Sequence, residues 1–363
     1  MAIRDHLVSV ESGSLQGVAG ADARVSVFRG VPFARPPVGA LRWRAPEPPA
    51  KWDGVRPARA FAPCSIQPPR PQNSISDFGV EPDDEDCLYL NVWTAAAGAG
   101  ERRPVMVWIH GGGFSYGSGS LPLFDGEALA RRGAVVVTIN YRLGPLGFLA
   151  HPELARESPH GVSGNYGFLD QIEALRWVQR NIAAFGGDPD RVLIFGQSVG
   201  SSSVSCLIAS PLAKGLFSRA IAQSGGSVGP LGAPGGGSMQ TLTQAQDTGV
   251  AFVKFHAAAS IAEMRERPAR SFQLPPRDAP PDPWMLRQAS QMLRNSGWVI
   301  VDGHAIPESP YDTYLNGRHN DVPLITGANA HEGSTQPTLD TLDRKSTRVN
   351  SSHIPLSRMP SSD

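Results

Sequence analysis

A G-x-S-x-G sequence at residues 196–200 follows directly after the apolar run at residues 192–195. The apolar run predicts a buried strand, and the small residues at 201–203 favour the start of a helix. A serine on such a turn projects its hydroxyl from the sheet edge, because the flanking glycines let strand and helix pass without a clash. The amino end of a helix also offers free N–H groups where negative charge develops in acyl transfer. The sequence therefore predicts that Ser198 is a nucleophile.

Three successive glycines, Gly111, Gly112 and Gly113, follow a second apolar run at residues 105–109. A glycine triplet is compatible with a flexible loop or a phosphate cradle, but no lysine and hydroxyl residue close it at the spacing of a phosphate loop. Without side chains, backbone N–H groups can come close enough to a substrate to donate to a carbonyl oxygen. Together with the serine turn, the triplet predicts an oxyanion loop and acyl-transfer chemistry.

Composition excludes several classes of function. The chain has 363 residues, and its 33 Lys and Arg residues balance its 33 Asp and Glu residues. It has no basic block or acidic tail, so nothing indicates nucleic acid or an anionic membrane as a partner. No apolar stretch reaches the length of a membrane-spanning helix, and residues 1–6 lack the apolar segment of a signal peptide. We therefore expect a small-molecule partner and, by default, a cytoplasmic location.

Strands and helices alternate around the two motifs. Apolar runs predict strands at residues 24–28, 88–93, 105–109, 134–139, 192–195, 220–222 and 322–327. A helical period predicts a helix over residues 168–185, ended by Gly186 and Gly187. A weaker pattern places a helix at 244–257 inside a lid-like excursion at 230–281. This order predicts an α/β fold with a mostly parallel central sheet and helices on both faces.

Longer motifs extend this pattern along the chain. They are FRGVPFA at 28–34, PPVG at 36–39, EDCLYLNVW at 85–93, GNYG at 164–167 with DQ at 170–171, and FGGDP at 185–189. Together they resemble the type-B carboxylesterase and lipase family, the α/β-hydrolases that include the cholinesterases. The resemblance covers residues 8–335, loosely at 229–270. It implies an α/β-hydrolase fold and a serine hydrolase that cleaves carboxylic esters through an acyl-enzyme, with no metal or organic cofactor.

The resemblance also implies roles for single residues. Ser198 matches the nucleophile, and the N–H groups of Gly112, Gly113 and Val199 match the oxyanion hole. Glu332, before a glycine at the end of a predicted strand, matches the acid of the catalytic triad. Ser224 matches a serine that supports the acid and the base by hydrogen bonding.

Two residues beside the nucleophile depart from the family pattern. Val199 stands where a small residue is usual, but the site requires only its N–H. Gln197 stands where glutamate is frequent, which removes a negative charge. Between Cys64 and Cys87 there is no tryptophan, so the aromatic platform of choline-ester enzymes is missing. The sequence therefore does not predict a cholinesterase.

The three cysteines are Cys64, Cys87 and Cys206. Three cysteines do not make a disulfide scaffold in a chain of this length, and the simplest interpretation is buried thiols. A bridge between Cys64 and Cys87 would close a polar loop. The resemblance implies this disulfide, because the two residues match the first disulfide pair of the family. It would favour an exported relative.

A histidine base should follow the acid in this fold. Only His353 follows Glu332, within a segment that does not fit the family. Back-translated, residues 343–363 resemble a sequencing adapter read in frame; a natural disordered tail is the alternative. We therefore expect a C-terminally truncated domain at 1–342, a non-native tail at 343–363, no catalytic base in this chain, and an inactive fragment.

Two other functions compete with ester hydrolysis. A cholinesterase-like binding or adhesion module commonly lacks the nucleophile, whereas Ser198 and the glycine triplet are intact here. A nucleotide-binding α/β protein would need a phosphate-loop lysine.

Overall fold

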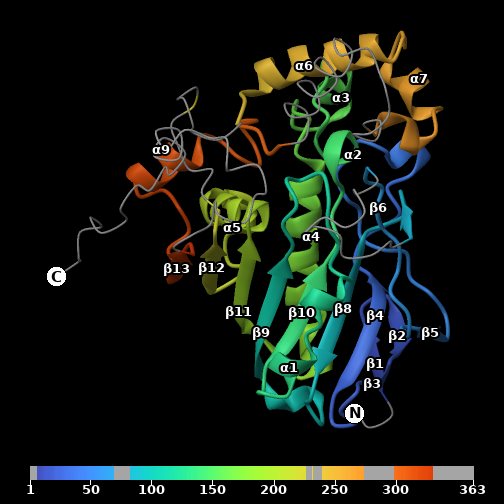
Figure 1. Cartoon of the computed structure of the whole chain (residues 1–363), viewed down its shortest axis with the longest axis vertical. Coiled ribbons are helices and arrows are strands. Elements are labelled where there is room, and N and C mark those ends of the chain that lie inside the picture. Colours follow the sequence, from blue (N-terminus) through green and yellow to red (C-terminus); the bar gives the residue numbers. More distant parts are fainter. Residues whose placement is uncertain (1–5, 69–81, 226–230, 232–238, 274–297, 330–363) are drawn as a thin grey trace, which may run out of the picture.

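The computed structural model describes residues 6–68, 82–225, 231, 239–273 and 298–329 (Figure 1). Its centre is an eight-stranded sheet. In spatial order the strands are β13 (Leu324–Gly327), β12 (Arg219–Gln223), β11 (Gly187–Gln197), β9 (Arg103–Ile109), β10 (Val135–Ile139), β8 (Tyr89–Thr94), β4 (Ser26–Pro32) and β3 (Val18–Ala19). The strands from β13 to β10 pair in parallel, whereas β8, β4 and β3 pair antiparallel.

Two smaller sheets flank the central one. The first contains β1 (Leu7–Val10), β2 (Gly13–Gln16) and β5 (Val55–Pro57). The second pairs β6 (Cys64–Ser65) with β7 (Asp83–Asp84) in parallel.

The alternation of buried residues shows that helices cover both faces of the central sheet. On β10, Val135 and Val137 belong to the largest core cluster, whereas Val136 belongs to a separate cluster with Trp93 and Ala130. Successive strand residues point to opposite faces. Ala130 comes from α1 (Glu127–Ala130), and the largest cluster receives apolar side chains from α4 (Tyr166–Asn181) and α5 (Val199–Ala209). The predicted arrangement of helices is therefore confirmed.

Helix α4 is the helix expected at residues 168–185. Its regular part ends at Asn181, and a 3-10 turn, Ile182–Phe185, completes the predicted length. Gly186 then has φ 77°, a left-handed conformation that glycine adopts without strain. The glycine stop signal in the sequence is confirmed.

The remaining helices lie mainly around the ends of the sheet. They are α2 (Gly144–Phe148), α3 (Pro152–Glu157), α6 (Leu242–Phe255), α7 (Ile261–Arg265) and α9 (Pro310–Leu315), with 3-10 turns at Gly39–Leu41, Ala99–Glu101, Pro122–Phe124, Pro211–Ala213 and Ala269–Phe272. Within the described ranges, no helix has both the length and the apolar character needed to cross a membrane.

We call the segment from α6 to Phe272 the cap segment. It lies at the end of the molecule toward which β9 and β11 run, drawn in gold in Figure 1. Its apolar residues form a second core with Trp43, Leu146, Leu149 and Leu154. Helix α6 begins at Leu242, two residues before the predicted start. A capping box between Thr241 and Gln244 stabilises this end of the helix.

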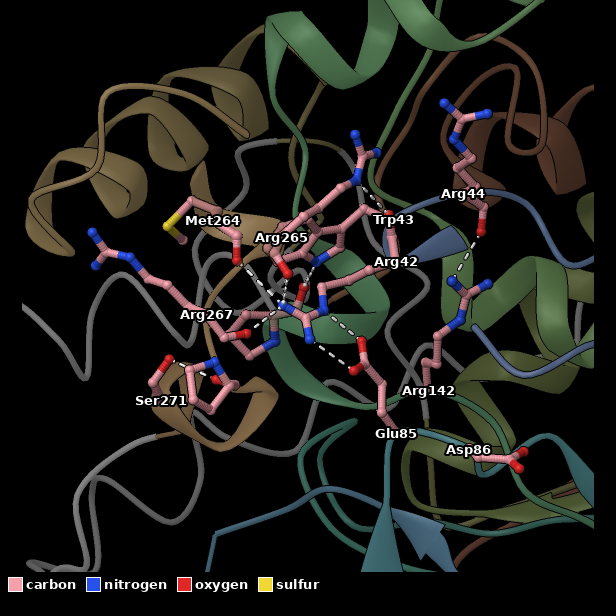
Figure 2. A network of polar contacts seen from close by, with 12 residues as sticks. Arg42, Trp43, Arg44, Glu85, Asp86, Arg142, Met264, Arg265, Arg267 and Ser271 are labelled. Carbon is pink, nitrogen blue, oxygen red and sulfur yellow. Dashed lines mark hydrogen bonds and ion pairs between the residues drawn. The ribbon is translucent and has the colours of Figure 1, made fainter. Parts of the chain in front are cut away.

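A buried arginine attaches the cap segment to the rest of the protein (Figure 2). Nη1 of Arg42 donates to the carbonyl oxygens of Met264, Arg265 and Arg267 at 3.2, 3.1 and 2.7 Å. The Nε and Nη2 groups of Arg42 donate to the two carboxylate oxygens of Glu85. One side chain therefore joins the sheet side of the molecule to the end of α7.

Candidate active site

Ser198 occupies a sharp turn between β11 and α5. Its φ and ψ are 57° and −125°, a combination that is rare for a residue other than glycine. The Ser198 N–H donates to the carbonyl oxygen of Gln223 on β12 at 2.9 Å, which holds the turn in place. Strained backbone of this kind persists where the surroundings fix it, and it is concentrated at functional sites.

Glycines permit this turn because there is no space for side chains. A Cβ atom built at Gly196 would lie 2.5 Å from the carbonyl carbon of Gly200. A Cβ atom at Gly200 would lie 2.1 Å from the carbonyl oxygen of Ile109, at the end of β9. Both distances are shorter than any van der Waals contact. The two glycines of the motif therefore have the packing role that the sequence predicts for them.

The glycine triplet begins directly against the serine. A Cβ atom at Gly111 would lie 3.1 Å from the Cβ of Ser198 and 2.6 Å from the carbonyl oxygen of Gln197. Gly112 and Gly113 have positive φ values of 111° and 66°. Ser115 and Tyr116 donate their N–H groups to the Gly112 carbonyl oxygen, so the chain turns back immediately.

Gly112 and Gly113, the two glycines of the predicted oxyanion loop, have different surroundings. A Cβ atom at Gly112 would lie 2.2 Å from the carbonyl oxygen of Tyr116, whereas one at Gly113 would have no neighbour within 4 Å. Gly112 is thus packed inside the loop and Gly113 borders open space. Val199, whose N–H is the third expected donor, begins α5 directly after the serine and is buried.

His110 supports the loop and is not placed to act as a base. Its buried ring stacks on Tyr141 with centroids 4.3 Å apart, and the Tyr141 hydroxyl donates to the His110 carbonyl oxygen at 2.7 Å. Burial raises the pKa of Tyr141, which keeps the hydroxyl protonated as a donor. No local motif in the sequence indicated this role for Tyr141.

Gln197 and Ser224 lie at the ends of the neighbouring strands β11 and β12. Gln197 is exposed, and its side-chain oxygen would lie 3.3 Å from a Cβ atom at Gly111. Ser224 has φ 50° and donates its N–H to Gly327 at 2.8 Å, at the end of β13. The structure thus brings both residues to the sheet end that carries Ser198. The hydrogen bonds expected from the Ser224 hydroxyl to an acid and a base remain a prediction.

Glu332, the expected acid, lies outside the described residues, as do His331 and His353. Its role therefore remains a prediction. In the described part of the chain, no histidine is hydrogen-bonded to the Ser198 hydroxyl. No group of three or more His, Cys, Asp or Glu side chains in that part is arranged to hold a metal ion.

The expected disulfide between Cys64 and Cys87 is not formed in the structure. Both residues are buried thiols, and the side-chain amide of Gln67 donates to the Cys64 sulfur at 3.2 Å. Burial raises the pKa of the Cys87 thiol well above its ordinary value. Because disulfide formation proceeds through a thiolate, the raised pKa slows oxidation of the Cys87 thiol.

The site therefore combines a serine in a strained strand-to-helix turn with a glycine loop packed on it. A family model described as "Carboxylesterase family" matches residues 4–357. The chain belongs to the carboxylesterase family. The match overlaps the segment at 343–363 that the sequence singles out as non-native, and the boundary at 342 remains a prediction.

Two curated relatives illustrate the similarity. The chain is 44% identical over 323 residues to the fumonisin B1 esterase of Sphingopyxis macrogoltabida, covering 89% of this chain and 55% of that protein. It is 38% identical over 328 residues to the para-nitrobenzyl esterase of Bacillus subtilis (strain 168), covering 90% of this chain and 63% of that protein. The chain thus spans between about half and two thirds of these relatives' length.

Solved structures show the same fold. A PNB esterase structure matches with a TM-score of 0.75 at 36% identity, covering 90% of this chain and 64% of that chain. A Geobacillus stearothermophilus carboxylesterase at pH 6.8 matches with a TM-score of 0.75 at 36% identity, covering 95% of this chain and 68% of that chain. The α/β-hydrolase fold that the family motifs imply is confirmed.

Proposed function

We propose that the protein to which this sequence belongs is a serine hydrolase that cleaves carboxylic esters through an acyl-enzyme. One observation carries the proposal: Ser198 sits in a strained turn with the Gly111–Gly113 loop packed against it. A strained serine is stabilised only by its surroundings, and here they include a glycine loop whose backbone N–H groups would donate to a carbonyl oxygen. Both relatives are named as esterases, so the proposal takes carboxylic esters as the substrate class.

In this mechanism the Ser198 hydroxyl attacks the ester carbonyl carbon while a histidine takes its proton. The N–H groups of Gly112, Gly113 and Val199 donate to the carbonyl oxygen as it becomes negatively charged. The tetrahedral intermediate then collapses, and the histidine returns the proton to the departing alcohol. Water attacks the acyl-serine in the same way and releases the acid. Glu332 would orient the histidine, and no cofactor takes part.

The neutral side chain of Gln197 avoids electrostatic repulsion of a negatively charged substrate near Ser198. A carboxylate at this position would repel an anionic acyl group at close range, and an amide does not. We therefore include esters of anionic acids in the proposed substrate class.

A non-catalytic binding module is the second candidate, and the strained Ser198 turn argues against it. Backbone strain costs on the order of 1–3 kcal/mol, and a module without catalysis has no reason to retain it. A fluorophosphonate probe applied to the whole protein separates the two functions. We expect covalent labelling of Ser198 that is lost in Ser198→Ala. A folded protein that stays unlabelled would support the binding module.

A further inference from the structure

Gln67 makes a double hydrogen bond with the backbone of Gly117, at the end of the oxyanion loop. The Gly117 N–H donates to the Gln67 side-chain oxygen at 2.9 Å, and the Gln67 side-chain nitrogen donates to the Gly117 carbonyl oxygen at 3.1 Å. The pair resembles one rung of a β-ladder, with a side-chain amide in place of a second strand. Gly117 is buried, so both of its backbone groups need partners inside the protein.

Gly117 closes the loop that carries the oxyanion donors. Its φ is 113°, and a Cβ atom there would lie 2.3 Å from Nδ1 of His110 and 2.6 Å from the Gly111 carbonyl oxygen. One residue earlier, the Tyr116 carbonyl oxygen packs against Gly112. The end of the loop therefore rests on its beginning, and a shift of Gly117 must move residues 110–112.

Gln67 is itself held firmly. Its side-chain nitrogen also donates to the Ser65 carbonyl oxygen at 3.1 Å and to the Cys64 sulfur at 3.2 Å. Its backbone N–H lies 3.4 Å from a carboxylate oxygen of Asp83 on β7. The amide is thus fixed to the small β6–β7 sheet before it contacts the loop, which is the arrangement expected of a rigid support.

We propose that Gln67 is a positioning residue that holds the oxyanion loop in register with Ser198 through its double hydrogen bond to Gly117. The catalytic part of this inference rests on the proposed esterase function. A primary amide suits the role because it carries a donor and an acceptor side by side, as a backbone peptide does. Misplacing a reacting group by about 1 Å can cost about 100-fold in rate, so support for the loop should be visible in catalysis.

The test compares Gln67→Met with Gln179→Met in the whole protein. Gln179 offers a matched control, because its side-chain nitrogen donates to the carbonyl oxygens of Pro189 and Leu216 at 2.9 Å each. The control thus loses backbone-directed hydrogen bonds from a partly buried glutamine whose acceptors lie outside the oxyanion loop. Gln67→Glu is a second variant, since it keeps the size of the side chain but places an oxygen against the Gly117 carbonyl.

Two readouts are needed. Hydrogen exchange followed by mass spectrometry should show residues 111–119 exchanging about 5- to 10-fold faster in Gln67→Met, as expected for the loss of ordinary hydrogen bonds. With p-nitrophenyl acetate, kcat should fall about 10- to 100-fold with little change in KM, because the loop acts mainly on the transition state. Gln67→Glu should behave in the same direction, and Gln179→Met should change neither readout.

The outcomes separate this inference from the proposed function. Unchanged exchange at residues 111–119 in both Gln67 variants overturns the proposal. Faster exchange at these residues in the Gln67 variants, together with a kcat no lower than that of Gln179→Met, also overturns the proposal. An unreactive Ser198 in the unaltered protein would count against the esterase function. The support of the loop by Gln67 could still be measured, because the exchange experiment needs no substrate.

Discussion

Around Ser198 the chain is held by backbone packed on backbone, whereas the cap segment, in addition to its apolar core, is held by a buried charged side chain that reaches backbone carbonyls. At the turn that carries Ser198, Gly200 packs against Ile109, and a Cβ atom at Gly225 would lie 2.3 Å from the Ser198 carbonyl oxygen. At the cap segment, the Arg42 and Glu85 side chains are only 6% and 13% exposed and carry the attachment (Figure 2).

This difference predicts different sensitivities. Close backbone packing leaves no room for added atoms, but it carries no net charge and should respond weakly to pH. An attachment through ionised groups tolerates small changes of shape, but it fails when one charge is removed, because the other is left buried without a partner. Substitutions and pH changes at the two regions should therefore separate them.

Ser198→Ala should have the largest effect. In the whole protein, kcat for p-nitrophenyl acetate should fall by about 10⁶-fold, because the nucleophile and its base act as one unit. Circular dichroism should match the unaltered protein, since the variant removes one oxygen and leaves the glycine contacts intact. Retention of more than a few per cent of activity would remove Ser198 from the nucleophile role.

Arg42→Met should have the largest effect on the cap segment. It leaves Glu85 unpaired and deprives three carbonyl oxygens of their donor. Breaking a buried ion pair on one side typically costs about 3–5 kcal/mol. We expect a loss of this size in the free energy of unfolding, measured by urea titration.

Arg44→Met is the control for Arg42→Met. Arg44 forms an ion pair with Glu157 at 3.3 Å, and its side chain is 49% exposed. A pair of this kind contributes about 0–1 kcal/mol, so this variant should lose little stability. Equal losses for the two arginines would contradict a special attachment through Arg42.

Gly112→Ala and Gly113→Ala should differ although the residues are neighbours. The methyl group at Gly112 meets the Tyr116 carbonyl, and the one at Gly113 meets open space. We expect kcat/KM to fall about 10²–10³-fold for Gly112→Ala, the size of losing an oxyanion donor. For Gly113→Ala we expect about 10-fold, from the left-handed backbone alone. Equal losses would show that the Tyr116 contact has no influence on the site.

The sequence predicted the features that depend on local patterns. Each of these features depends on a few consecutive residues, because chain geometry restricts which residues fit there. They are the strand before Ser198, the glycine stop after α4 and the glycine triplet. Gln67 and Gly117 lie 50 positions apart, and Arg42 lies 222 positions from Met264. The residues around Gln67 and Arg42 do not indicate these partners, because only the complete fold brings the paired residues together.

The Cys64–Cys87 prediction was wrong for a related reason. It rested on similarity of position, and the structure instead shows two buried thiols. Their state depends on the environment that folding creates around each sulfur, including the amide of Gln67 at Cys64. A motif specifies which residues are present but not the burial that raises the pKa of Cys87.

The smallest expected effect concerns pH and the cap segment. His256 follows α6, and its ring lies against Phe252 and Phe272 with centroids 4.5 and 5.4 Å away. Burial first, and then the charge of Arg267, lower the pKa of His256 below its ordinary value. The unfolded chain therefore binds a proton more readily than the folded one. Stability is retained above the unfolded pKa of about 6.5 and is lost as pH falls from there toward the lower folded value.

We expect this loss to be local, since the groups around Ser198 are uncharged backbone. Hydrogen exchange, corrected for the intrinsic effect of pH, should show α6 losing more protection than α5 between about pH 7 and pH 5.5. His256→Gln cannot gain the proton and should remove most of this extra loss in α6 while leaving α5 as it was. If α5 loses as much protection as α6, or if His256→Gln leaves the pH dependence of α6 unchanged, the electrostatic contrast between the two regions is wrong.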